Sequence, residues 1–81
     1  KRWYELVEIA QQIAGQEYEV LDHKSSIAVF KKSDAAGRAI TICPIYHQID
    51  ARRGFEDLAV RIGEAYESRE TLKYTVRIRG D

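Results

Sequence analysis

The chain has 81 residues, of which 44% are hydrophobic and 32% are charged, and its 13 basic and 13 acidic residues give a formal net charge of zero. This composition predicts one small domain over residues 1–81, and it excludes disorder because apolar residues are ample and net charge is nil. It also excludes a membrane-spanning helix, since no apolar run approaches about 18 residues. A single core of this size gives marginal stability, which favours association with a second chain.

The first predicted element is a helix over about residues 2–14, because apolar residues recur there at helical spacing. These positions are Trp3, Leu6, Val7, Ala10, Ile13 and Ala14. Gly15 is suited to the left-handed C-cap that ends such a helix. Alternating or β-branched stretches then predict three strands, over Tyr18–His23, Ile27–Lys31 and Ala39–Cys43.

The connections between these strands are short, so the strands are expected to pair antiparallel. A polar turn at residues 33–37 separates the second strand from the third, and Pro44 ends the third because proline lacks an N–H donor. We expect Ile45–Asp50 to be a connector whose last residue, Asp50, caps a second helix.

The second helix is predicted from an apolar stripe at helical spacing. It consists of Phe55, Leu58, Ala59, Ile62, Ala65 and Tyr66. Gly63 interrupts the stripe, which indicates close packing on the sheet. Residues 72–79 alternate and predict a last strand, and the crossover of about thirty residues before it suits a parallel connection. The predicted fold is therefore a two-layer α+β domain of order α-β-β-β-α-β, with a mixed four-stranded sheet and both helices on one face.

Five stretches of the chain carry a resemblance to a known family. They are Leu6–Ala10, Gln16–Val20, Lys31–Asp34, Gly37–Ile40 and Tyr74–Ile78. Together with the element order, they resemble the first helix, the strands and the central hairpin of restriction-endonuclease-like (PD-(D/E)xK) nucleases of the Mrr type. The resemblance implies a nuclease-like core.

That family holds a divalent metal with an Asp on the second strand and a Glu or Gln followed by Lys on the third. The residue matching the Asp is Ala28 or a neighbour, and the stretch matching the third strand, Thr41–Pro44, contains no carboxylate or lysine. The resemblance therefore implies a relative without the family's catalytic or metal-binding residues, which favours a chain without enzymatic activity. The enzymatic alternative is a divergent nuclease whose catalytic residues are supplied from neighbouring positions.

The first five elements also resemble a second group, the double-stranded-RNA-binding domains and the HicA mRNA-cleaving toxins. Lys24–Lys32 is similar to the HicA stretch that carries a catalytic histidine, but Ile27 occupies that position. Ile49–Gly54 is similar to the HicA segment before the last helix, and Arg52 and Arg53 partly match the basic helix start of the RNA-binding domains. This resemblance implies an inactive toxin-like fold as an alternative.

The neutral total conceals an uneven distribution of charge. Residues 31–53 and 69–81 carry net charges of +3 and +2, whereas residues 1–30 and 54–68 carry −2 and −3. The basic segments suggest a phosphate-binding patch for DNA or RNA. Its candidate residues are Lys31, Lys32, Arg38, Arg52, Arg53, Lys73, Arg77 and Arg79.

The alternation of the strands also predicts an outer sheet face that is more apolar than solvent contact requires. Its interface candidates are Leu21, Ala28, Phe30, Thr41 and Cys43, and Ala39 is expected beside them. The alternative is a local slip in register that places Phe30 in the core.

Other chemistry has little support in the sequence. His23 and His47 are interpreted as solvated, Cys43 is interpreted as a small half-buried side chain, and together they lack zinc-ligand spacing. No nucleotide-binding or nucleophile motif occurs, so no cofactor is expected. The absence of methionine suggests a processed or excised chain, and no targeting segment is visible, so we expect a cytoplasmic location.

We therefore predict a non-catalytic, nuclease-like module that associates with itself, as a homodimer, or with a nucleic-acid-processing protein. Direct binding of DNA or RNA is the alternative prediction. Neither a membrane nor a small-molecule cofactor is an expected partner.

Overall fold

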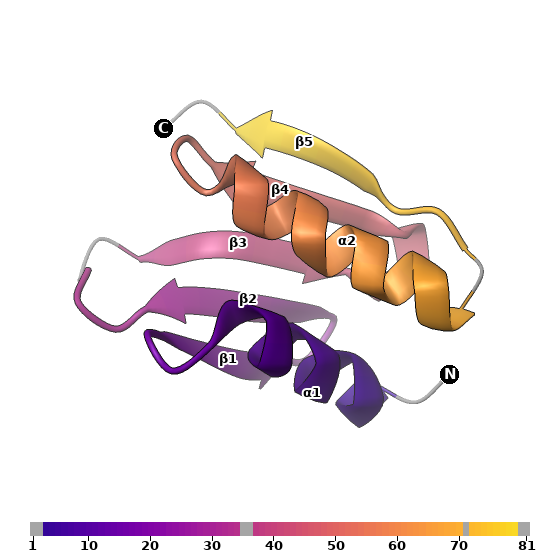
Figure 1. The fold of residues 1–81 in the computed structure, drawn as a ribbon, viewed down its shortest axis with the longest axis horizontal. Coiled ribbons are helices and arrows are strands. Elements are labelled where there is room, and N and C mark those ends of the chain that lie inside the picture. Colours follow the sequence, from indigo (N-terminus) through magenta and orange to yellow (C-terminus); the bar gives the residue numbers. More distant parts are fainter. Residues whose placement is uncertain (1–2, 35–36, 71, 80–81) are drawn as a thin grey trace.

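Two helices cover one face of a five-stranded sheet in the computed structural model, which describes residues 3–34, 37–70 and 72–79 (Figure 1). The helices are α1 (Trp3–Ala14) and α2 (Glu56–Glu70). The strands are β1 (Tyr18–His23), β2 (Ser26–Lys31), β3 (Arg38–Cys43), β4 (Gln48–Arg52) and β5 (Thr75–Arg79). The predicted α+β class is confirmed, whereas the predicted number of four strands is wrong.

The strands lie side by side in chain order, from β1 to β5. The first four pair antiparallel, and β5 pairs parallel to β4 after the crossover through α2. The parallel connection is as expected, and the strand beside the last strand is the additional strand, β4. The last strand is also shorter than predicted, because the regular pairing begins only at Thr75.

The additional strand lies in the segment that we expected to be a connector. A short 3₁₀ turn, Pro44–Tyr46, and a left-handed backbone at His47 (φ 52°) reverse the chain after β3. The next residues then pair with β3 and bury Ile49 and Ala51. Asp50 is therefore a strand residue and not the cap of the second helix, which begins only at Glu56.

Helix α1 ends as predicted. Gly15 has a φ of 87°, and its N–H donates to the carbonyl oxygen of Gln11 at 2.9 Å. Arg2, at the predicted start of the helix, lies outside the described residues, as do Ala35 and Ala36 in the predicted hairpin turn.

The core lies between the helices and two rows of strand residues that are aligned across the sheet. The first row is Val20, Val29, Ile40, Ala51 and Ile78, and the second is Ile27, Ile42, Ile49 and Val76. The buried helix residues above them are Leu6, Ile9, Ala10, Leu58, Ala59, Ile62 and Tyr66. Alternate strand residues therefore face the helices, as the sequence pattern predicted, and Ile78 is the least covered member of the rows at 45% exposure.

Ala39, which we expected on the outer face, lies elsewhere. The register between β2 and β3 shifts between Val29 and Phe30, so that Val29 pairs with Ile40 but Phe30 pairs with Arg38. Ala39, the extra residue at this irregularity, is buried with the core rather than lying on the outer face. Phe30 also pairs with Glu19, whose neighbour Val20 faces the helices, so Phe30 lies on the outer face.

Gly63 faces the sheet, as its position in the apolar stripe indicated. A Cβ placed there would lie 3.5 Å from Ile49 Cδ1 and 3.7 Å from Val76 Cγ2, which are ordinary contact distances. Replacing Gly63 with alanine should therefore raise the free energy of unfolding by about 0.5–1 kcal/mol, because alanine favours the helix. Urea denaturation followed by circular dichroism measures this change. Gly63→Leu is the control, because overpacking should lower stability; a lower stability for the alanine variant would contradict the prediction.

Candidate interaction surface

The face of the sheet opposite the helices, here called the open face, is covered by no described element (Figure 1). Its central row is aligned across all five strands and consists of Leu21, Ala28, Thr41, Asp50 and Arg77. The row changes from apolar at the β1 edge to charged at the β5 edge. The open face therefore has two parts with different chemistry.

The apolar part lies over β1 and β2. Leu21 is 37% exposed, and the ring of Phe30 contacts the ring of His23 edge-on, with 6.1 Å between centroids. Arg38 Nη2 donates to His23 Nδ1 at 3.0 Å, since a guanidinium carries only donors. Ala28 is 0% exposed, so it supports this surface from below but offers no accessible area.

The remaining interface candidates form the transition between the two parts. Thr41 and Cys43 lie on β3, are both half-buried, and pair with Asp50 and Gln48 of β4. Cys43 is a free thiol. These two side chains are only weakly polar.

The charged part lies over β4 and β5. Asp50 Oδ1 accepts hydrogen bonds from Gln48 Nε2 at 3.0 Å and from Arg77 Nε at 3.2 Å. The second contact is an ion pair in which the Arg77 side chain is half exposed. Exposed pairs of this kind add only about 0–1 kcal/mol to stability. The main effect of the Asp50–Arg77 pair is to hold the Arg77 guanidinium on the open face at the edge of the sheet.

Six of the eight basic candidates lie in or next to the strand ends at one end of the sheet, at the left in Figure 1, but the guanidinium of Arg38 is directed away from that end toward His23. They are Lys31, Lys32, Arg38, Arg52, Arg53 and Arg79. Lys73 precedes β5 at the opposite end, 3.8 Å from Glu67, and Arg77 lies at the middle of β5.

Acidic and aromatic groups partly occupy this basic end. Arg52 pairs with Asp34 at 2.8 Å, and its guanidinium lies 5.2 Å from the centre of the Phe55 ring. Glu17 shares a groove with Lys31 and Lys32. The end is therefore a mixed surface, on which Arg79 has no partner among the described residues.

The two edges of the sheet differ in a way that the sequence did not reveal. At the β1 edge, Gln11 of α1 acts like a strand residue: Val20 N–H donates to its Oε1 at 3.2 Å, and its Nε2 donates to the Tyr18 carbonyl at 3.0 Å. The Tyr18 N–H donates to the Gly15 carbonyl at 3.2 Å. Gly15 and Gln11 thus satisfy both outward backbone groups of Tyr18 and the N–H of Val20, which closes the first part of the β1 edge. Only the spacing of Gln11 from β1 would have suggested this closure.

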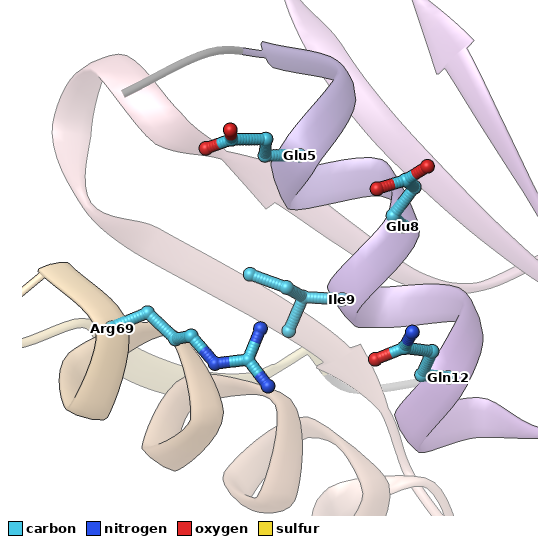
Figure 2. Close-up of a pocket in the computed structure, with 5 residues that line it drawn as sticks. All are labelled: Glu5, Glu8, Ile9, Gln12 and Arg69. Carbon is cyan, nitrogen blue, oxygen red and sulfur yellow. The ribbon is translucent and has the colours of Figure 1, made fainter.

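A shallow hollow of about 340 Å³ lies between the two helices (Figure 2). Arg69 reaches from α2 toward Ile9 and Gln12 of α1, and the carboxylates of Glu5 and Glu8 lie along its rim. No set of three or more His, Cys, Asp or Glu side chains within the described ranges is arranged to hold a metal ion.

His47 is better explained by packing than by chemistry. Its ring contacts Tyr74 edge-on at 5.3 Å, and Tyr74 in turn contacts the buried Tyr66 at 5.0 Å. Its carbonyl oxygen accepts the N–H of Thr75 at 2.9 Å, the first bond between β4 and β5. His47 therefore helps to position the last strand.

The fold and its surfaces define a two-layer α+β domain with one uncovered sheet face. Neither the family models, nor the curated proteins, nor the solved structures contain a significant match to this chain. Neither helix, over the residues described, has the length and apolar character needed to cross a membrane.

Proposed function

We propose that this chain is a non-catalytic association module that joins a second copy of itself through the apolar part of the open face. The observation that carries the proposal is the exposed Leu21 beside the half-buried Phe30, on a sheet face that no described element covers. Two-layer domains with an apolar outer sheet face commonly cover it with a partner.

The absence of catalytic groups at the expected positions supports a binding role. The resemblance matches Ala28 or a neighbour to the position where those nucleases carry an Asp, and the residues at the end of β3 are Thr41, Ile42 and Cys43. The nuclease-like ancestry is itself part of the proposal, as is a link to a nucleic-acid-processing assembly.

The test is to place a charge on the apolar part. Leu21→Glu should weaken self-association about tenfold or more, because a carboxylate cannot be buried without a partner at low cost. Sedimentation velocity over a range of micromolar concentrations measures the monomer–dimer equilibrium. Phe30→Glu should have the same effect.

Val60→Glu is the matched control, since Val60 is an exposed apolar residue on α2, away from the open face. It should leave the equilibrium unchanged. A wild-type chain that stays monomeric at every concentration would contradict self-association, as would equal effects of the Leu21 and Val60 variants.

A further inference from the structure

The β5 strand is an open edge of the sheet. It is the last strand in the sheet order and pairs only with β4. In a parallel pair, alternate residues direct both backbone groups toward the neighbouring strand, and Thr75 does so through its bond to His47. Val76 and Ile78 therefore direct their N–H and C=O groups outward, where no partner exists among the described residues.

The side chains beside these free groups form two chemically distinct rows. Arg77 and Arg79 lie on the open face, both exposed. Arg77 engages Asp50 through Nε alone among the described contacts, which leaves its terminal nitrogens available. On the other side of the strand, the 45% exposed Ile78 lies at the margin of the core. A strand added to this edge would thus meet cations on one side and an aliphatic surface on the other.

A second copy of the chain does not fit this edge well. Antiparallel pairing of β5 with its own copy would bring Arg77 and Arg79 against the same arginines, and like charges in adjacent strands repel. The β1 edge carries acidic Glu19, but the bonds of Gln11 and Gly15 close its first part, at Tyr18 and Val20. The occupant that suits β5 is therefore a different chain.

We propose that β5 binds an extended acidic peptide by strand addition, with carboxylates at alternate positions opposite Arg77 and Arg79 and aliphatic side chains against Ile78. Backbone hydrogen bonds to Val76 and Ile78 supply affinity, and the arginines select the acidic sequence. This site goes beyond the proposed self-association, because the apolar part of the open face lies at the opposite side of the sheet.

The experiment uses the full chain and a fluorescent seven-residue peptide in which glutamate and valine alternate. Fluorescence anisotropy at low salt should show saturable binding. A peptide with lysine in place of glutamate should bind about tenfold or more weakly, because the charge-assisted hydrogen bonds are lost. Arg79→Glu should reverse the preference for the glutamate peptide over the lysine peptide. Arg69→Glu, on α2, is the control and should leave this preference unchanged.

Backbone N-methylation separates strand addition from simple charge attraction. Two peptides are methylated on opposite sets of alternate residues, so that only one set removes the N–H groups that face β5. One peptide should lose binding about tenfold, while the other keeps it. The proposal is overturned if both or neither lose binding, or if the lysine peptide binds equally well. It is also overturned if an oligothymidylate binds more tightly than the unmodified peptide and displaces it, which would assign the arginines to nucleic acid.

Discussion

Replacing Tyr66 with alanine should lower the free energy of unfolding by about 3–5 kcal/mol, the cost of removing a large buried aromatic side chain. Tyr66 is 0% exposed and is the largest fully buried side chain of the described chain. Its hydroxyl donates to the Leu6 carbonyl at 2.8 Å, and its ring contacts Tyr74 at 5.0 Å. It thereby connects α1, α2 and the segment before β5.

A domain of this size has a total stability of roughly 5 kcal/mol, so the alanine variant should be largely unfolded at room temperature. Urea denaturation monitored by circular dichroism measures the loss. Tyr66→Phe is the matched control: it keeps the ring, removes the hydrogen bond to Leu6, and should cost about 1–3 kcal/mol. Equal losses for the two variants would show that packing of the ring contributes little.

Replacing Gln11 with leucine should have the second-largest effect, about 1–3 kcal/mol, because backbone groups of Tyr18 and Val20 lose their partners. The same change opens the β1 edge. That edge carries Glu17 and Glu19, which could then meet Arg77 and Arg79 of another copy. We therefore expect a destabilised chain that also assembles from edge to edge as its concentration rises.

Chemical denaturation and light scattering during size-exclusion chromatography measure the two consequences separately. Gln12→Leu is the control, since Gln12 is the exposed neighbour on α1 and its side chain makes no hydrogen bond among the described contacts. The assembly should weaken in high salt. It should also disappear when Arg79→Glu is combined with Gln11→Leu; assembly that persists in this double variant would contradict edge-to-edge pairing.

The sequence by itself determined the elements that depend on local patterns. Helical spacing defined α1 and α2, Gly15 marked the end of α1, and alternation defined β1, β2 and β3. The same alternation predicted which residues of the strands face the helices, because side chains of a strand point to opposite faces in turn. These features need only the chemistry of neighbouring residues.

The interaction surfaces could be predicted from the sequence only in part. Leu21 and Phe30 could be placed on the outer face from alternation, and the basic residues could be identified from charge alone. Whether the basic residues meet depends on strand order, which places Arg79 beside Arg52. The contact of Arg38 with His23, 15 residues apart in sequence, has no local signal.

Only the tertiary structure decided the arrangement of the sheet edges. The segment Gln48–Arg52 has just two buried apolar positions, so its strand character comes from the partners on both sides, β3 and β5. Because β4 lies between β3 and β5, the last strand does not pair with β3 and forms an edge of the sheet. Gln11, seven residues before the start of β1, closes the first part of the other edge through hydrogen bonds with Tyr18 and Val20. A strand acquires its hydrogen bonds from residues distant in sequence, so which edge stays open is decided only when the helices and strands pack together.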